Sequence, residues 1–374
     1  MATAQPKAAP DVGTPSNVHD TMAPWLRKIS DVNEGEEAIK KAGERYLPRY
    51  EAEKAQTYAR RLATTPFWPG FRDAIENVVG KPFATPIALN NENDGSSVSG
   101  FKISDIESDI DGAGNNLHVF ARNLFYSSVL NGFSGILVDF PEISAETKTL
   151  ADERKSNARP YWVLLNAGQI LDCRYEMRGG KQIVSLLRFR SWITEPDGEW
   201  GEKEVEKVNV YRPGSFEVWQ KDTSSWRRVR AGNFTLSEVP YVPFYTGEKF
   251  GSYGARPYFL QLAEKAIHIY RKLSRKEMTY SLAGFPMLKI IGLASSDDIQ
   301  STRDERREVG KTVTVGPGQV ISLAMTPSGE SGDASYIAPP AEVLTEIRED
   351  IESDVREFLR LARQPMQPGT GNPT

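Results

Sequence analysis

Apolar residues recur every three or four positions in several segments of the chain, which is the spacing of one face of an α-helix. The pattern is clearest over residues 341–363, where one stripe is formed by Leu344, Ile347, Ile351, Val355, Phe358 and Ala362. Helices are also predicted over 25–61 with a break at Pro48, over 71–79, over 117–131 and over 257–282. Glycine stands just beyond each of the last three, as is common where helices end.

A different pattern, of short β-branched and aromatic runs, covers residues 159–244. Strands are predicted over 161–165, 183–190, 207–211, 216–220 and 226–230. Glycine-containing pairs at 197–198, 213–214 and 231–232 indicate turns, so we expect a meander-like β region. Additional strands are expected over 135–139, 287–291, 312–315 and 319–324. Helical and strand-rich segments are largely separate along the chain, which favours an α+β fold.

Composition narrows the class of protein. The chain has 374 residues, 39% of them hydrophobic, which is enough for two or three domains with real cores. No apolar run approaches the roughly 20 residues of a membrane-spanning helix. Residues 1–17 are poor in large apolar side chains, and we expect a disordered tail over 1–22. Cys173 is the only cysteine, which excludes an intrachain disulfide and a thiolate metal cluster.

The net charge of the chain argues against tight, static binding of nucleic acid. The formal net charge is −4, whereas proteins that hold nucleic acid by its phosphates are usually basic. The chain therefore either ignores nucleic acid or lets it slide past, and composition leaves both interpretations open.

The sequence contains only incomplete versions of known catalytic and phosphate-binding motifs. Gly310-Lys311-Thr312 ends like a phosphate-binding loop, but Glu305 stands where glycine is needed and a strand is predicted where a helix should follow. The histidines at 19, 118 and 268 are far apart, and no nucleophile elbow is present. We expect no catalytic residue, no metal site and no cofactor, so the protein is not predicted to be an enzyme.

Asp109-Ile110-Asp111-Gly112 resembles the start of a calcium loop. Ala113 and Phe120 occupy two positions that need oxygen ligands. We expect instead that these acids satisfy backbone amides in a turn before the helix at residue 117.

Two of the predicted helices have opposite charge character. A basic cluster on 257–282 consists of Lys265, Arg271, Lys272, Arg275 and Lys276, and 341–363 carries Glu346, Glu349 and Asp350 on an acidic face. A solvated helix face would explain both clusters. We favour a contact between subunits, because a ring needs a heterologous interface in which different faces meet.

Several short segments, taken in order, resemble a family of portal proteins from short-tailed and related phages. They are 42–50 with Tyr46-Leu47-Pro48, then 109–114, 135–141, 159–161, 242–244, 263–280 with Gly284-Phe285-Pro286, 315–318 and 364–371. Each motif is short, and the shared order from about Trp25 onward carries the resemblance.

The resemblance implies a portal-type subunit with a mixed α/β wing, a helical stem and a small β-containing clip. On this chain it implies a wing over 23–256, a stem helix over 257–283, clip and adjoining strands over 284–339, and a second stem or wing helix over 340–363. Residues 364–374 would begin the tunnel loop, facing DNA through Gln364, Pro365, Met366, Gln367, Gly369, Thr370 and Asn372. The long helix and crown that follow in the family are expected to be missing.

The function implied by the resemblance is that of a portal vertex subunit in the virion, assembled in the host cytoplasm. Such subunits form a ring, of twelve copies by resemblance, through which the genome is packaged and ejected. The implied partners are double-stranded DNA, passed without sequence recognition, the terminase large subunit, and capsid and tail adaptor proteins; no membrane is involved. Two other interpretations stay open: a metal-dependent hydrolase using Asp109 and Asp111, and another head-to-tail adaptor ring.

Overall fold

The computed structural model describes residues 10–87, 107–141, 159–223, 225–283, 287–291, 333–337 and 341–362. The chain forms two compact units. The first unit comprises Met1–Glu51, Pro66–Tyr270 and Asp354–Thr374, and the second comprises Ala52–Thr65 and Arg271–Ser353. The described part combines helices and sheets, as the α+β expectation requires.

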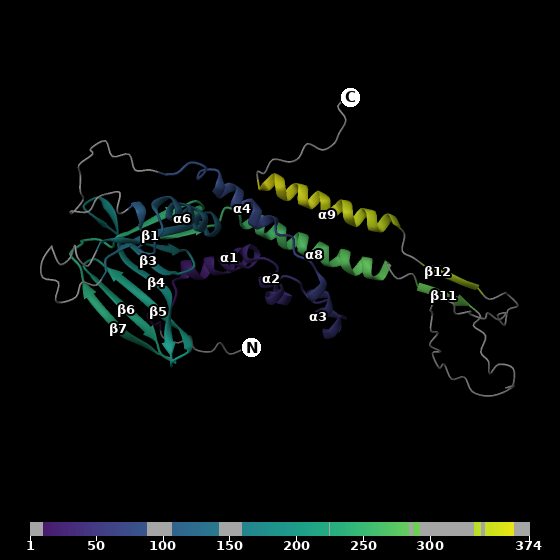
Figure 1. Ribbon diagram of the computed structural model, residues 1–374, viewed down its shortest axis with the longest axis horizontal. Helices are drawn as coiled ribbons and strands as arrows, with labels where there is room; N and C mark the ends of the chain where they lie inside the picture. The colour runs from purple at the N-terminus through teal and green to yellow at the C-terminus, as the bar shows by residue number, and fades with distance from the viewer. Residues whose placement is uncertain are drawn as a thin grey trace, which may run out of the picture. The chain divides into compact units, whose positions relative to one another are not determined.

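A five-stranded antiparallel sheet dominates the first unit (Figure 1). Its strands follow one another in the order β3 (Ile170–Arg178), β4 (Lys181–Asp197), β5 (Gly201–Arg212), β6 (Ser215–Lys221) and β7 (Trp226–Asn233). The expected meander is therefore confirmed, although β3 was not predicted.

The turn predicted at 231–232 is wrong, because both residues lie inside β7. Gly232 pairs with Phe216 on β6, and a Cβ at Gly232 would approach Phe216 Cε1 to 2.5 Å. This glycine therefore makes room for an aromatic ring across the ladder and does not mark a reversal of the chain.

A smaller antiparallel sheet completes the body, with strand order β2-β1-β8. Its strands are β1 (Phe133–Asp139), β2 (Tyr161–Asn166) and β8 (Tyr241–Tyr245). The helix α6 (Leu117–Asn131) leads into β1 through Gly132, whose φ of 88° is readily adopted by glycine. Side chains from both sheets share one core, which includes Phe133, Leu137, Leu165, Leu187 and Tyr241. The short strands β9 (Glu248–Phe250) and β10 (Gly254–Arg256) pair beside it.

The N-terminal segment is ordered well before residue 23, so the tail predicted over 1–22 is wrong for residues 10–22; residues 1–9 lie outside the described part. Helix α1 (Asn17–Glu34) starts at an N-cap, where Ser16 accepts a hydrogen bond from the His19 amide. Its buried stripe begins at Met22, which is fully buried in the core. The segment is poor in large apolar residues, and its composition therefore predicted disorder. It is instead held by contacts with distant parts of the chain.

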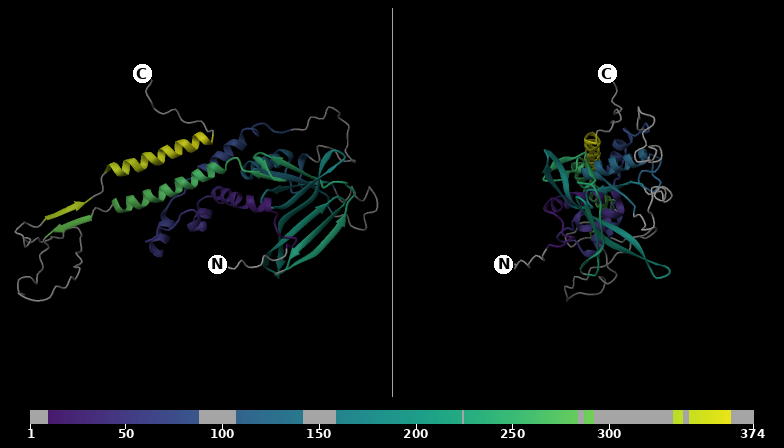
Figure 2. Two further views of the ribbon diagram at one scale, coloured as in Figure 1. Left: turned by 180° about the vertical axis from the view of Figure 1, so that it is seen from behind. Right: turned by 90° about the vertical axis from the view of Figure 1, so that its left-hand side faces the viewer.

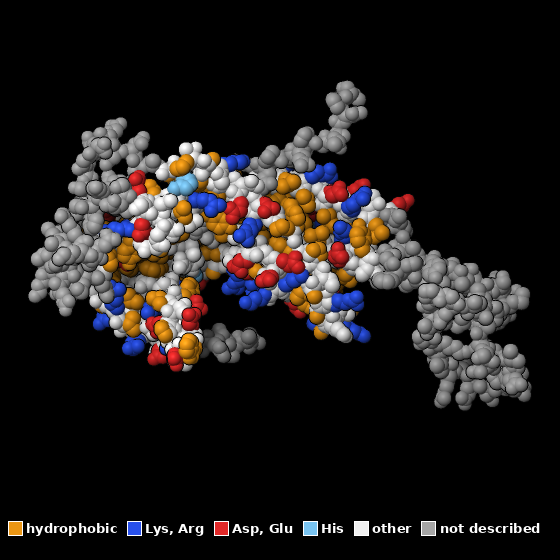
Figure 3. Space-filling view, in the orientation of Figure 1, with side chains coloured by type: hydrophobic (Ala, Val, Ile, Leu, Met, Phe, Trp, Pro, Cys, Tyr) orange, Lys and Arg blue, Asp and Glu red, His pale blue; other side chains and the backbone are white. Residues whose placement is uncertain are grey.

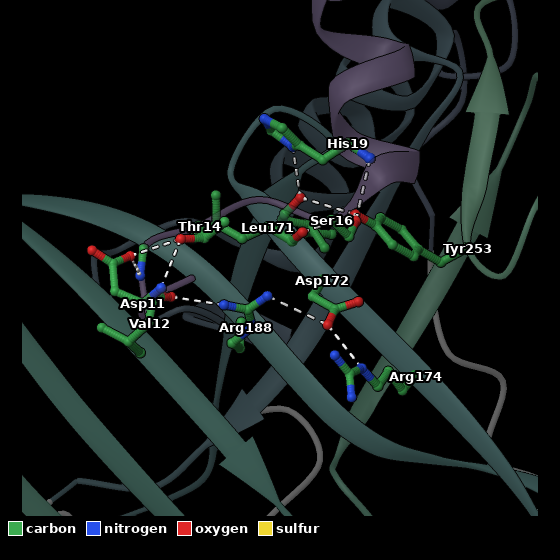
Figure 4. A network of polar contacts seen from close by, with 12 residues as sticks. Asp11, Val12, Thr14, Ser16, His19, Leu171, Asp172, Arg174, Arg188 and Tyr253 are labelled. Atoms are coloured by element: carbon green, nitrogen blue, oxygen red, sulfur yellow. Dashed lines mark hydrogen bonds and ion pairs between the residues drawn. The ribbon is translucent and has the colours of Figure 1, made fainter. Parts of the chain in front are cut away.

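Those contacts tie the segment to the large sheet (Figure 4). The Ser16 amide donates to the Leu171 carbonyl at 2.9 Å, and the Ser16 hydroxyl shares a 2.8 Å hydrogen bond with the Tyr253 hydroxyl. Arg188 donates to the Val12 carbonyl at 2.9 Å, and His19 Nδ1 donates to the Ile170 carbonyl at 2.9 Å. Burial lowers the pKa of His19, so the ring stays neutral near pH 7.

The helical region predicted over 25–61 is divided in the structure, around the predicted break at Pro48 and also at Gly35. After α1 come α2 (Glu36–Ala42), the 3₁₀ turn η1 (Gly43–Arg45) and α3 (Ala55–Thr64), and α4 (Gly70–Gly80) follows. The first break is at Gly35, whose φ of 96° ends α1. The helix predicted over 71–79 is confirmed by α4.

Two long helices close the described chain. The predicted helices are confirmed as α8 (Leu260–Ala283) and α9 (Ala341–Leu361), and the predicted strand 287–291 is β11 (Met287–Ile291). β11 pairs antiparallel with β12 (Asp333–Ile337), so the chain runs from α8 through this strand pair to α9 (Figure 2). The strands predicted over 312–315 and 319–324, the motif at 310–312 and the tunnel loop over 364–374 lie outside the described residues. None of the described helices is long and apolar enough to cross a membrane.

Candidate functional site

A row of ion pairs joins α8 to α9. Lys265 Nζ donates to Asp354 Oδ1 at 2.8 Å and also binds the carboxylate of Glu357. About two turns further along α8, Lys272 Nζ lies 2.7 Å from Asp350 Oδ2. The residue numbers of the partners decrease along α9 as they increase along α8, so the two helices run antiparallel.

The centre of this row is largely screened from water. The side chains of Lys265 and Asp354 are 17% and 12% exposed. Burial alone would lower the pKa of Lys265, but its hydrogen bonds to Asp354 and Glu357 outweigh burial and raise it. The same hydrogen bond from Lys265 lowers the pKa of Glu357. Lys265 and Glu357 are therefore charged at neutral pH, and the contribution of Glu357 is lost as pH falls through its titration range.

Aromatic contacts fix the end of α9 that belongs to the first unit. Phe358 is fully buried and meets the Trp68 ring edge-on, with the ring centroids 4.8 Å apart. The preceding residue of the loop between α3 and α4, Phe67, packs in the same way against Tyr270 of α8 at 5.8 Å. The loop that carries both rings thus contributes side chains to both helices.

The basic cluster predicted on α8 does not have one role. Lys265 and Lys272 bind acids of the same chain, including the predicted Asp350, so these three have intramolecular partners. Lys276 lies over the Tyr280 ring at 5.3 Å from its centroid. Arg271, Arg275, Glu346 and Glu349 have exposed side chains. An intersubunit contact for these exposed residues stays a prediction.

Sequence reasoning did not single out Asp354, Glu357 or His268. Asp354 and Glu357 stand three positions apart, a spacing that places both carboxylates on one face of α9. His268 Nε2 lies 3.4 Å from Asp354 Oδ2, one turn from Lys265 on α8. The spacing of the two acids could be seen in the sequence. Which basic residue of α8 they contact depends on the register between two helices that are far apart in sequence.

The turn before α6 contains the two acids that the hydrolase interpretation needs. Asp111 Oδ1 accepts hydrogen bonds from the Ala113 amide at 2.9 Å and the Asn115 amide at 3.2 Å. Asp109 Oδ1 accepts from the Gly114 amide at 2.9 Å. The predicted role of both acids, to satisfy backbone amides in this turn, is confirmed.

Asp109 has a second role that the sequence did not indicate. Its other oxygen, Oδ2, accepts from Arg159 at 2.7 Å, and the Arg159 side chain is 9% exposed. Both carboxylate oxygens of Asp109 are therefore used inside the protein. Within the described ranges, no group of three or more His, Cys, Asp and Glu side chains is placed to hold a metal ion.

We expect Asp111→Asn to leave folding nearly unchanged, with a loss below about 1 kcal/mol, because an amide oxygen can still accept from the Ala113 and Asn115 amides. Asp111→Ala removes the acceptor and should cost about 1–2 kcal/mol. Urea unfolding of the two variants and the wild type measures the difference. Equal losses in both variants would show that the side chain does not support the turn.

The only cysteine is not placed to act as a nucleophile. Cys173 lies on β3 with no exposed surface, and burial raises the pKa of its thiol to about 12. The reactive thiolate is therefore scarce near pH 7.

No protein-family model and no curated protein sequence matches this chain. Among solved structures, it is similar to a chain from the neck of an empty GTA particle computed with C6 symmetry, with 10% identity and a TM-score of 0.39 over 87% of this chain and 74% of that chain. A chain from the neck of the native GTA particle computed with C12 symmetry gives 10% identity and a TM-score of 0.37 over 82% and 69%. A chain from the virion of the native gene transfer agent particle gives 10% and 0.38 over 89% and 77%.

Proposed function

We propose that this chain is a portal-type subunit of a phage-like particle and that it acts as a structural component, not as an enzyme. One observation carries the proposal: the chain runs from a long helix through an antiparallel strand pair to a second long helix, and ion pairs hold the two helices together. This is the stem, clip and stem order that the resemblance of the sequence implies.

The charge on α9 fits a channel through which DNA slides. Apart from the carboxylates that bind α8, its exposed charged side chains are Glu342, Glu346, Glu349 and Glu352 and the three arginines Arg348, Arg356 and Arg360. Carboxylates repel the phosphates of DNA, and contact with them does not release counterions from the DNA. An acidic surface therefore does not trap DNA. We propose double-stranded DNA, passed without sequence recognition, as the cargo.

The remaining parts of the proposal follow from the resemblance. The ring would have twelve copies and would dock the terminase large subunit and the capsid and tail adaptor proteins at the portal vertex of the virion. Residues 364–374, outside the described part of the chain, keep their proposed place at the start of the tunnel loop. The hydrolase interpretation is not retained as a proposal, because backbone amides and Arg159 use the carboxylates of Asp109 and Asp111.

We expect the full chain, purified at several salt and protein concentrations, to form rings with a central opening. Negative-stain electron microscopy with class averaging, together with sedimentation velocity, tests this. Because assembly can require other particle proteins, the same particles should be sought after coexpression with the capsid protein. A chain that stays monomeric under all these conditions would contradict the proposal.

A further inference from the structure

The hairpin of β4 and β5 extends beyond the rest of the large sheet. β3 pairs with β4 only as far as Phe189, and β6 pairs with β5 only from Lys207 onward. Residues 191–206 therefore form a two-stranded ribbon, called here the β4–β5 arm, whose strands pair with no other described strand. A two-stranded ribbon is at best marginally stable in water without a surface to pack on.

The arm exposes large apolar side chains at its end. Trp200 is 90% exposed, and Trp192 and Ile193 are 48% and 44% exposed. The tight turn that presents Trp200 uses Gly198, with a φ of 78°, and Gly201, where a Cβ would lie 2.3 Å from the Asp197 carbonyl oxygen. A tryptophan presented in this way is the kind of residue that anchors protein interfaces.

Acidic residues surround these apolar side chains. The arm carries one basic residue, Lys203, and the acids Glu195, Asp197, Glu199, Glu202, Glu204 and Glu206. Glu195 and Glu206 bind Lys207 and Arg190 within the sheet. Among the described residues, the carboxylates nearest the tip, on Asp197, Glu199, Glu202 and Glu204, make no ion pair.

Basic side chains lie along β7, the last strand of the same sheet. Among the described strands β7 pairs only with β6, and it exposes Arg227, Arg228 and Arg230 around Val229, which is 40% exposed. Arg228 also lies 3.3 Å from Glu217 of β6. The ladder skips Val229, because Val218 faces Arg230 while Trp219 faces Arg228. In Figure 3 acidic side chains gather at the tip of the sheet and basic ones along its outer border near β7.

The acidic arm and the basic β7 edge are complementary in charge, and neither is complementary to a second copy of itself. Two β7 edges would bring arginines together, and two arms would bring carboxylates together, so symmetric pairing is disfavoured. An arm against a β7 edge pairs carboxylates with guanidinium groups and can place Trp200 against an arginine, and tryptophan is the most favourable aromatic partner in a cation–π contact. The interrupted ladder at Val229 favours a contact through side chains over a continued sheet.

We propose that the β4–β5 arm of one copy of this chain binds the arginine-bearing β7 edge of a second copy. The inference rests on the proposed ring, because a contact between two different surfaces of the same chain is heterologous and closes into a ring when the rotation allows. It assigns the large sheet, and not only the helices, to the interface between subunits.

Two chains of different length, each with one introduced cysteine, test the contact directly. Glu202→Cys in a tagged chain and Arg228→Cys in an untagged chain are mixed and treated with a flexible bis-maleimide, while the native Cys173 has no exposed surface. We expect a cross-linked product of mixed size that exceeds the products of either chain alone. The matched control replaces Glu202→Cys by Glu51→Cys, an exposed position outside the arm, and should give no excess. An equal yield in the mixture and the control would overturn the inference.

Charge reversal gives a second readout. Glu202→Arg with Glu204→Arg, and separately Arg227→Glu with Arg228→Glu, should each weaken self-association about tenfold at low salt, and the four changes together should restore it. Rings that persist unchanged in both reversed variants would refute the arm contact while leaving the proposed function intact. Specific cross-linking without closed rings in electron microscopy would support the contact and contradict the ring.

Discussion

Replacing Arg61 by methionine is expected to destabilise the second unit by about 3–5 kcal/mol, because it removes the guanidinium group from a buried carboxylate. Arg61 Nε and Nη2 donate to the two oxygens of Glu53 at 2.8 and 2.7 Å. Both side chains are 4% exposed. Arg61 also donates to the Ser274 hydroxyl of α8 at 3.3 Å, so this pair links α3 to that helix. Urea unfolding of the full chain measures the loss.

Two further variants separate burial from charge. Arg60→Met changes the exposed neighbour on the same helix and should alter stability by less than about 0.5 kcal/mol. Combining Arg61→Met with Glu53→Leu removes both charges and should recover most of the loss, because an apolar pair can replace a buried ion pair. If Arg61→Met were as mild as Arg60→Met, the pair would contribute nothing to this unit.

Phe358→Ala is expected to cost about 3–5 kcal/mol, since it deletes a fully buried ring and leaves a cavity. The lost contact with Trp68 should also loosen the end of α9. Amide hydrogen exchange resolved to individual peptides should therefore show faster exchange in α9, beyond the change in the unfolding midpoint.

Leu361 is the matched control on the same helix, because its side chain is 39% exposed. Leu361→Ala should cost less than about 1 kcal/mol and leave the exchange of α9 nearly unchanged. The assignment of Phe358 as the anchor of α9 would be wrong if the two alanine variants behaved alike.

Local patterns in the sequence predicted the elements that stabilise themselves locally. The stripe from Leu344 to Ala362 is readable because every member lies on one helix face, and Asp111 is readable because its partners are two and four residues away. The partner of Asp109 could not be read, because Arg159 lies 50 residues further along the chain.

The errors arose where a distant contact decides the local structure. Residues 10–16 have little apolar surface of their own, and they are ordered by hydrogen bonds to β3, β4 and Tyr253. Gly232 was read as a turn because the aromatic ring that requires it lies on the neighbouring strand. The basic residues of α8 were read as one cluster, but the sequence alone did not distinguish a partner on the same chain, as for Lys265 and Lys272, from one on a neighbour.

The spacing of the acids along α9 has a mechanical consequence. Asp350, Asp354 and Glu357 follow one another at intervals close to one helical turn, and Lys265 can meet a neighbouring pair of them after α9 shifts by one turn, about 5.4 Å. The ion pairs alone would therefore allow a second register of the two helices, in which Lys265 contacts Asp350 and Asp354. Phe358 against Trp68, together with the buried Ile351 and Ala362, favours the observed register over a shifted one.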